Sequence, residues 1–239
     1  LESSAAAARY YHSMVWDDAS RSAIVFGGYG TTYLNSTHRL YATPTGWGWD
    51  VLAPSGTAPT ARYGHSAVWD PARGEMIVFG GYTGSYQNSV HVLRRVSGAW
   101  QWSTVTPTGT LPTARYSHGA IWDAARERMV VYGGQGASGS LSDVWTLTRN
   151  GSGWVWAQAT VSGSPGTRYR HAVAWDPARD RMLVFGGSGT TTTGLLTVTG
   201  PSSFSWTAVT PSGTAPVVRY ASAVAWDAAR ERMVVFGGY

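Results

Sequence analysis

The sequence predicts an all-β fold made of repeated units, and three observations support this prediction. A twenty-residue motif, as in RYSHGAIWDAARERMVVYGG, occurs five times and starts at Arg9, Arg62, Arg115, Arg168 and Arg219. Apolar residues in each copy alternate with small or polar ones, and each copy closes on a double glycine. Spacings of 53, 53, 53 and 51 residues are typical of architectures in which each repeat packs on its neighbours.

The third repeat predicts four short strands, at 116–122, 128–132, 143–147 and from 154 onward. A polar turn at 123–126 separates the first two, and the second is β-branched and aromatic, as a buried strand should be. Gly133 and Gly134 end it where the backbone must turn or pass close to another segment. The linkers SGTAPTAR, TGTLPTAR and SGTAPVVR contain prolines that predict an extended, unpaired path to the next repeat.

Four antiparallel strands per repeat, stacked radially, form a β-propeller, which protects its strand edges. A helical solenoid is excluded because no repeat has a sufficiently long stretch of 3.6-residue periodicity. We expect one domain over 1–239 with four complete repeats and a fifth inner hairpin, about five blades in all. The repeats are 9–61, 62–114, 115–167, 168–218 and the partial repeat 219–239.

The pattern Arg-Tyr-x-His-x-x-x-Trp-Asp, followed by Met-Val-Val-Phe/Tyr-Gly-Gly and later by Trp, resembles the kelch repeat over residues 9–239. The resemblance implies that the first strand lies nearest the propeller axis and that loops on one face bind proteins or other ligands. The WD40 repeat is a weaker match, because Trp-Asp here precedes the second strand and lacks an upstream Gly-His pair. The motif tryptophans are expected to be mostly buried between blades; they are Trp16, Trp69, Trp122, Trp175 and Trp226.

Two sets of repeated polar residues are candidate sites. The histidines His12, His65, His118 and His171 share one position on the first strand, where a ring of imidazoles could attract a metal. Metal ligands must converge to about 2 Å from one ion, so we favour structural histidines on separate blades. The arginines Arg9, Arg62, Arg115, Arg168 and Arg219 form a candidate ring at the channel mouth, which could bind a carboxylate, a phosphate or an acidic sugar. We favour arginines that bond backbone carbonyls of the adjacent blade.

Composition argues against several functions. The chain has no cysteine, no nucleophile or phosphate-binding motif, and ten of its thirteen acidic residues in the Trp-Asp turns, so we expect neither an enzyme nor a cofactor or metal site. Its net charge of +5 is carried by arginines mixed with acids, which argues against nucleic-acid binding. No apolar run is long enough for a membrane helix.

The loops after the double glycines vary and are rich in Tyr, Ser, Thr, Asn, Gln and Gly, which suits ligand binding. Their candidate binding residues are Tyr29, Tyr33, Asn35, Tyr82, Tyr86, Asn88, Gln135, Ser138, Ser188 and Thr191. We expect a non-enzymatic binding or scaffolding module whose partner is a protein or a glycan, with an extracellular or cell-surface bacterial location favoured. A lectin-like propeller and an accessory propeller of a larger enzyme remain alternatives.

The fifth repeat stops after its double glycine, so its second strand should have no third partner. Strand 233–236 would then present an apolar edge that seeks pairing. We expect self-association through residues 233–239 and the facing flank of the first blade, or else marginal stability as a monomer.

Overall fold

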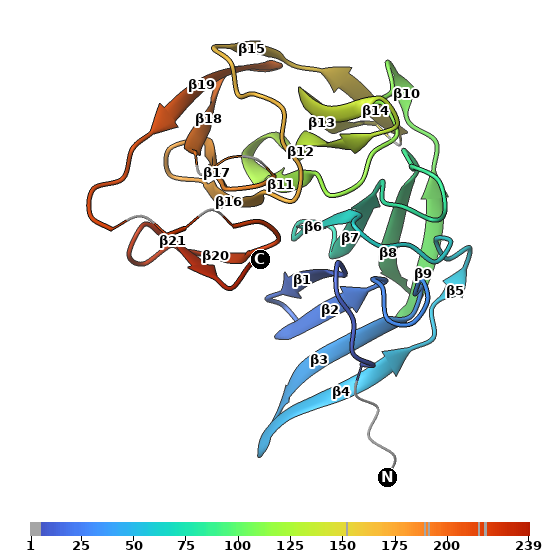
Figure 1. Cartoon of the computed structure of the whole chain (residues 1–239). Helices are drawn as coiled ribbons and strands as arrows, with labels where there is room; N and C mark the ends of the chain where they lie inside the picture. Colours follow the sequence, from blue (N-terminus) through green and yellow to red (C-terminus); the bar gives the residue numbers. More distant parts are fainter. Residues whose placement is uncertain (1–5, 152, 189, 191, 215, 218) are drawn as a thin grey trace. The chain divides into compact units, whose positions relative to one another are not determined.

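The computed structural model of the chain describes residues 6–151, 153–188, 190, 192–214, 216–217 and 219–239. Their secondary structure is β, apart from one short 3₁₀ turn at Ala124–Arg126 (Figure 1). Residue contacts divide the chain into two compact units, each described by itself. Unit 1 comprises Leu1–Pro107 and Ala114–Tyr116, and unit 2 comprises Thr108–Thr113 and Ser117–Tyr239.

Unit 1 holds the first two blades. Blade 1 is a four-stranded antiparallel sheet of β1 (Ser13–Asp17), β2 (Ser22–Phe26), β3 (Thr37–Thr43) and β4 (Gly46–Leu52). Blade 2 repeats this order with β6 (Ser66–Asp70), β7 (Glu75–Phe79), β8 (Val90–Val96) and β9 (Ala99–Val105), and it adds β5 (Ser55–Gly56) on its outer edge.

Unit 2 holds two further blades and a hairpin. Blade 3 consists of β11 (Gly119–Asp123), β12 (Arg128–Gly136), β13 (Gly139–Asn150), β14 (Gly153–Gln158) and β10 (Thr108–Gly109). Blade 4 consists of β16 (Ala172–Asp176), β17 (Arg181–Phe185), β18 (Thr193–Gly200), β19 (Ser203–Val209) and β15 (Thr160–Ser162). The hairpin is formed by β20 (Ala223–Asp227) and β21 (Arg232–Phe236). These sheets confirm the predicted all-β propeller class.

The linkers SGTAPTAR and TGTLPTAR begin with a short paired strand, so the prediction of an unpaired path is wrong at their first two residues, whereas the described residues of SGTAPVVR form no strand. Ser55 and Gly56 of β5 lie opposite Gln101 and Trp102 of β9 in a parallel pair, and β10 and β15 join β14 and β19 in the same way. The linker prolines come after these short strands, where no ladder hydrogen bond from their nitrogen is needed. Three of the blades are consequently five-stranded.

The core of unit 1 lies between its two blades. Every residue of β2 and of β7 is buried, whereas β1 alternates between buried and exposed residues. Phe26 of blade 1 and Trp102 of blade 2 lie with ring centroids 4.9 Å apart in the same apolar cluster. In unit 2 a corresponding cluster includes Tyr132 of blade 3 and Phe204 of blade 4.

The motif tryptophans are less buried than predicted. Trp69, Trp122, Trp175 and Trp226 are half-buried, and Trp16 is 43% exposed. In β1, β6, β11 and β16 the tryptophan alternates with the fully buried residues, so it occupies the less buried side of its strand. Trp69 and Trp175 still pack against the core clusters of their units.

The first glycine of the double glycine lets two blades approach closely at Gly27, and Gly133 and Gly186 likewise lie against the arginine carbonyl of the next repeat. Gly27 has a φ of +64°, and a Cβ there would lie 2.8 Å from the carbonyl oxygen of Arg62 and from the imidazole of His65, both in the next repeat. The second glycine donates a backbone hydrogen bond to that arginine carbonyl, over 2.9 Å from Gly28 N to Arg62 O. A side chain is excluded at Gly27 by both backbone conformation and space.

Candidate functional site

Eight tyrosines gather where the first strands of unit 1 begin and the second strands end. We call this set the tyrosine face: Tyr10, Tyr11, Tyr29, Tyr33, Tyr63, Tyr82, Tyr86 and Tyr116. Tyr10 is 54% exposed and the other seven are half-buried. The face therefore offers both ring surfaces and hydroxyl groups to a ligand.

Backbone pairing brings these tyrosines together in two equivalent sets. Tyr29 bridges both Tyr10 and Tyr33 in antiparallel fashion, and in the second repeat Tyr82 bridges Tyr63 and Tyr86. Each loop is closed by a hydrogen bond back to the second glycine, from Leu34 N to Gly28 O and from Gln87 N to Gly81 O. The variable loops of the first two repeats are thus built to one plan.

Tyr63 lies at the centre of the face. Its ring centroid is 6.0 Å from Tyr11, 5.7 Å from Tyr29, 5.6 Å from Tyr33, 5.7 Å from Tyr82 and 5.8 Å from Tyr116. Interplanar angles across the face run from 31° to 88°. Because most rings meet at an angle, the surface consists of ridges and grooves rather than one flat platform.

Acidic side chains are kept away from this face. Asp17, Asp70 and Glu75 of unit 1 lie at the opposite ends of their strands, in or beside the Trp-Asp turns. Asp50, on the outer strand of blade 1, pairs with Arg39. A ligand on the tyrosine face therefore meets aromatic and hydroxyl groups with no carboxylate from the described part of unit 1 among them.

The other candidate loop residues are not part of this face. Asn35 and Asn88 are exposed at the ends of the two loops. Gln135 belongs to β12, because that strand and β13 continue as a hairpin in which Gln135 pairs with Ser140, so the third loop is largely a strand extension. Ser138 is exposed at the tip of this hairpin, and Ser188 donates its backbone N–H to Tyr169 O. Thr191 lies outside the described residues.

The candidate arginine ring is engaged with backbone. Arg62 is buried, and its guanidinium donates to Gly80 O (2.9 Å), Ser89 Oγ (3.0 Å) and Thr60 O (3.0 Å). Arg9 and Arg219 make the equivalent bond to the first glycine of their own repeats, Gly27 and Gly237, each over 3.0 Å.

Two more members of the ring are buried in the same manner. Arg115 and Arg168 have almost no exposed surface, and Arg168 donates to Gly186 O and to Pro165 O. The side chain thus ties the first strand to its own blade, and the backbone of Arg62 bonds Gly28 and Leu34 of the preceding repeat. We expected the arginine side chains to bond backbone carbonyls of the adjacent blade. In the structure the backbone of Arg62, rather than its side chain, forms the hydrogen bonds to the adjacent blade.

The repeated histidines lie on the blade contacts. His65 Nε2 is 2.8 Å from Ser13 Oγ, and burial, with a contribution from Arg62, lowers the pKa of His65 to about 3. Burial likewise lowers the pKa of His171 to about 3. His91, which contacts Arg62, has its pKa lowered to about 4 by burial and by that guanidinium. His12 is exposed in the first repeat.

Within the part of the chain that the structure describes, no three His, Cys, Asp or Glu side chains lie together as a metal site would need. Nor does any helix among these residues have the length and apolar character required to cross a membrane.

Sequence reasoning identified four tyrosines of the face as loop residues and noted a tyrosine after each arginine. It did not associate Tyr10, Tyr63 and Tyr116 with the loops, and it did not single out Tyr11. The signal was present, because the residue after the arginine and the residue after the double glycine are both tyrosine in the first two repeats. In the fourth repeat Ser188 replaces the second of these tyrosines.

Comparison with known proteins agrees with the repeat pattern. The sequence model of the KLHDC2/KLHL20/DRC7 Kelch-repeats domain matches residues 40–238. The chain is 34% identical over 175 residues to the leucine-zipper-like transcriptional regulator 1 homolog of Drosophila melanogaster, covering 68% of this chain and 17% of that protein. It is 30% identical over 188 residues to human host cell factor 1, covering 69% of this chain and 9% of that protein. The chain thus corresponds to a small part of either relative.

Proposed function

Because the chain belongs to the kelch-repeat family, we propose that it is a non-enzymatic protein-binding module whose partner docks on the tyrosine face of unit 1. The observation that carries this proposal is the set of eight tyrosines in continuous ring contact, on loops that one scaffold holds in place. Tyrosine supplies a large, rigid contact area at a low cost in conformational entropy, and the neighbouring Ser, Thr, Asn and Gln residues supply adaptable hydrogen bonds.

The chemistry of the face favours a polypeptide with few charges. No carboxylate from the described part of unit 1 lies on the face, and the buried guanidinium of Arg62 is already occupied by backbone and side-chain acceptors. The grooves between tilted rings suit side chains that insert between them, such as proline or aliphatic residues. A sugar would stack better on a single flat ring, so the lectin-like alternative is less well supported.

The test uses two loop tyrosines at equivalent positions. Tyr33→Ala combined with Tyr86→Ala removes one ring from each loop and leaves the central Tyr63 in place. The 239-residue chain is used to select binders from a random peptide library, and the affinity of selected peptides is measured for both proteins. We expect the double variant to bind at least about ten-fold more weakly, as expected when aromatic anchors are removed from an interface.

Tyr41→Ala is the matched control. Tyr41 is also half-buried, but it lies on β3 opposite Ser22, at the end of the sheet away from the loops. Its removal should leave peptide affinity unchanged. Peptides that bind the double variant as tightly as the Tyr41→Ala variant would contradict the proposal. Failure to select any peptide, together with tyrosine-dependent binding on a glycan array, would also contradict it.

A further inference from the structure

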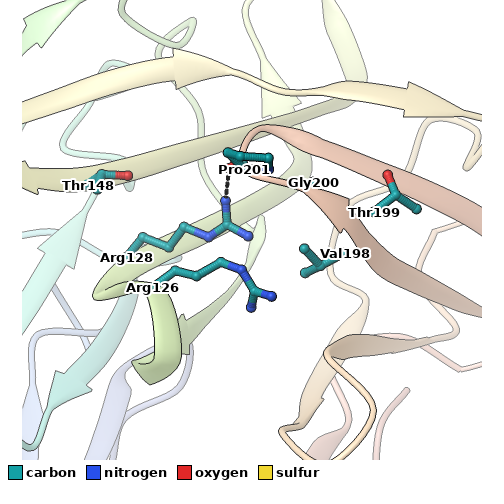
Figure 2. A pocket seen from close by; sticks show the side chains of 7 residues that line it. All are labelled: Arg126, Arg128, Thr148, Val198, Thr199, Gly200 and Pro201. Carbon is teal, nitrogen blue, oxygen red and sulfur yellow. Dashed lines mark hydrogen bonds between the residues drawn. The ribbon is translucent and has the colours of Figure 1, made fainter.

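A pocket of about 520 Å³ lies in unit 2, away from the residues assigned so far. It is lined by Arg126, Arg128, Thr148, Val198, Thr199, Gly200 and Pro201 (Figure 2). One wall comes from blade 3, and the other comes from the end of β18 and the turn that follows it in blade 4. A pocket of this volume suits a small organic molecule or one or two side chains of a peptide.

Arg128 is the most unusual residue of the pocket. Only 2% of its surface is exposed, and it starts β12 directly opposite Thr148 of β13. Its Nε donates to Asp123 Oδ2 over 2.9 Å, and its Nη1 donates to the carbonyl oxygen of Pro201. Its Nη2 is buried and has no hydrogen-bond partner among the described residues. A buried charged donor without an acceptor is costly, so this atom calls for a further partner.

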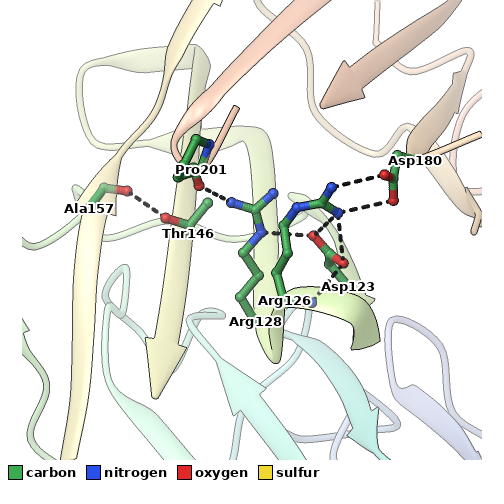
Figure 3. Close-up of polar contacts among 7 residues, drawn as sticks. All are labelled: Asp123, Arg126, Arg128, Thr146, Ala157, Asp180 and Pro201. Carbon is green, nitrogen blue, oxygen red and sulfur yellow. Dashed lines mark hydrogen bonds and ion pairs between the residues drawn. The ribbon is translucent and has the colours of Figure 1, made fainter. Parts of the chain in front are cut away.

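Two aspartates compensate the positive charges of Arg126 and Arg128. Arg126 forms a two-point contact with Asp180, at 3.0 and 2.9 Å, and also contacts Asp123 (Figure 3). The hydrogen bond from Arg126 lowers the pKa of Asp180, so this carboxyl stays ionised. Arg128 extends toward the turn that carries Pro201 (Figure 2), whereas the guanidinium of Arg126 beside it is directed toward Asp180 (Figure 3). Two aspartates thus balance two guanidiniums, and one donor of Arg128 is left over.

The opposite wall has an irregular backbone. The pairing of β18 with β19 changes register between Val198 and Gly200, a type of irregularity that often lies beside functional sites. Val198 N also donates to Asp180 O over 2.9 Å, which fixes this wall to the turn of blade 4. Val198 and Pro201 supply apolar contacts, while Thr199 and Thr148 bring hydroxyl groups to the pocket.

We propose that this pocket binds a singly charged carboxylate group, which accepts a hydrogen bond from Arg128 Nη2 while its carbon substituent lies against Val198 and Pro201. A phosphate dianion fits less well, because it needs several donors and Asp123 and Asp180 already compensate both guanidiniums. The carboxylate can belong to a free small acid or to an acidic side chain of a peptide. The site is independent of the tyrosine face.

The fourth repeat supplies an internal comparison. Arg181 occupies the position of Arg128, lies opposite a threonine, Thr197, and donates to Asp176 Oδ2 over 3.0 Å. Its side chain is 27% exposed, against 2% for Arg128. Blade 4 is followed by the two-stranded hairpin β20–β21, which within the described residues has no outer strands to form a second wall.

The test follows binding of benzoate to the isotope-labelled 239-residue chain by NMR, through the Gly200 amide and the Arg128 Nε–H signals. Benzamide, which has the same ring and no charge, is the ligand control. We expect saturable binding of benzoate at these signals and at least about ten-fold weaker binding of benzamide, because the neutral amide oxygen accepts a weaker hydrogen bond from the guanidinium than a carboxylate does. Equal binding of both compounds, or no saturable shift with benzoate, would overturn the proposal.

Three variants assign the effect to this pocket. Arg128→Lys keeps a positive charge beside Asp123 but lacks the second terminal nitrogen, and Thr148→Val changes the wall without touching the ion pairs. Both should weaken benzoate binding, the lysine variant by about ten-fold. Arg181→Lys, at the equivalent position in blade 4, should bind like the unaltered chain. Benzoate shifts that persist in Arg128→Lys and Thr148→Val alike would place the binding elsewhere and refute the assignment.

A peptide pair distinguishes the two sources of the carboxylate. An acetylated and amidated Gly-Gly-Glu-Gly-Gly peptide is compared with its Gln counterpart at the same signals. Preference for the glutamate peptide assigns the pocket to acidic side chains of a partner. Binding of benzoate with no difference between the peptides assigns it to free small acids.

Discussion

His65 Nε2 lies 2.8 Å from the hydroxyl oxygen of Ser13, a residue 52 positions earlier in the chain. Both groups are buried, and the contact joins β1 of blade 1 to the residue that directly precedes β6 of blade 2. Burial lowers the pKa of His65 to about 3, so the imidazole is neutral at physiological pH. In the fourth repeat, His171 is equally buried but faces Gly119 at the position of Ser13, and its Nε2 has no partner among the described residues.

These neutral histidines predict that mild acid destabilises the protein. The pKa values of His65 and His171 are about 3 in the folded state, against 6.5 as the ordinary value. Below pH 6.5 the unfolded chain therefore binds more protons than the folded one, and the free energy of unfolding falls as the pH falls. Each histidine should contribute a loss of about 1 kcal/mol between pH 6 and pH 5. Urea unfolding at these two pH values measures it.

His65→Gln is the variant that separates this effect from general acid denaturation. It should lower stability at pH 7, because the Ser13 contact is disturbed, yet reduce the loss between pH 6 and pH 5 by about 1 kcal/mol. His12→Gln changes the more exposed histidine of the same set, whose pKa burial and Arg9 lower less strongly than that of His65, so it should reduce the loss between pH 6 and pH 5 by less than His65→Gln does. An unchanged slope in His65→Gln would show that this imidazole is not held neutral.

Arg62 is predicted to be a major stabilising residue of unit 1. Arg62→Met keeps the aliphatic stem but leaves the carbonyls of Gly80 and Thr60 without their donor. We expect the free energy of unfolding to fall by about 3 kcal/mol, since buried acceptors without partners are costly. Chemical denaturation measures the change.

Arg9→Met is the matched control for this prediction. Arg9 makes the equivalent hydrogen bonds to Gly27 and Ser36, but it is half-exposed, so water can replace the lost donor. The free energy of unfolding should fall clearly less in Arg9→Met than in Arg62→Met. Equal costs for the two variants would mean that burial does not determine the contribution of these arginines.

The aromatic residues of the fourth strands differ sharply in burial. Trp102 is 2% exposed against Phe26, whereas Trp47, on the corresponding strand of blade 1, is 62% exposed. Trp102→Ala should lower the free energy of unfolding by about 3–5 kcal/mol, because it leaves a cavity between two blades. Trp47→Ala should change it by less than about 0.5 kcal/mol. Similar unfolding midpoints for the two variants would contradict the packing described for unit 1.

The repeat period and the alternating apolar pattern were sufficient to predict the strands, the turns and the close approach at the double glycines. Local spacing carries that information, because strand faces and turns depend on neighbouring residues. The parallel pairing of Ser55 with Gln101 could not be predicted, since it depends on how one repeat meets the next. Burial of Trp16 was overestimated for the same reason, because its environment comes from distant chain segments.

One of the two candidate sites could be predicted from the sequence, and the other could not. The tyrosine loops stood out because they vary on a constant scaffold, and the structure adds that Tyr63 lies at their centre. The pocket at Arg128 gave no sequence signal, because Arg181 occupies the same position in the next repeat. The two arginines differ in the structure, where Pro201 and Thr199 lie opposite Arg128.

The hairpin β20–β21 leads to a prediction about assembly. Within the described strands β21 pairs only with β20, and its Val234 and Phe236 are exposed, the latter by 80%. In the other blades the equivalent strand is covered by a third strand, as β17 is by β18. An apolar edge of this kind pairs readily with a strand of another chain. We therefore expect the 239-residue chain to self-associate through residues 233–239 as its concentration rises.

Light scattering coupled to size-exclusion chromatography measures the association, and Phe236→Lys tests its location. A charge on an edge strand opposes pairing, so this variant should shift the chain toward the monomer without loss of the other blades. Leu111→Lys, which places the same charge on another exposed apolar residue, should associate like the unaltered chain. A monomer at every concentration would refute the prediction, and association that persists in Phe236→Lys but disappears in Leu111→Lys would move the interface away from β21.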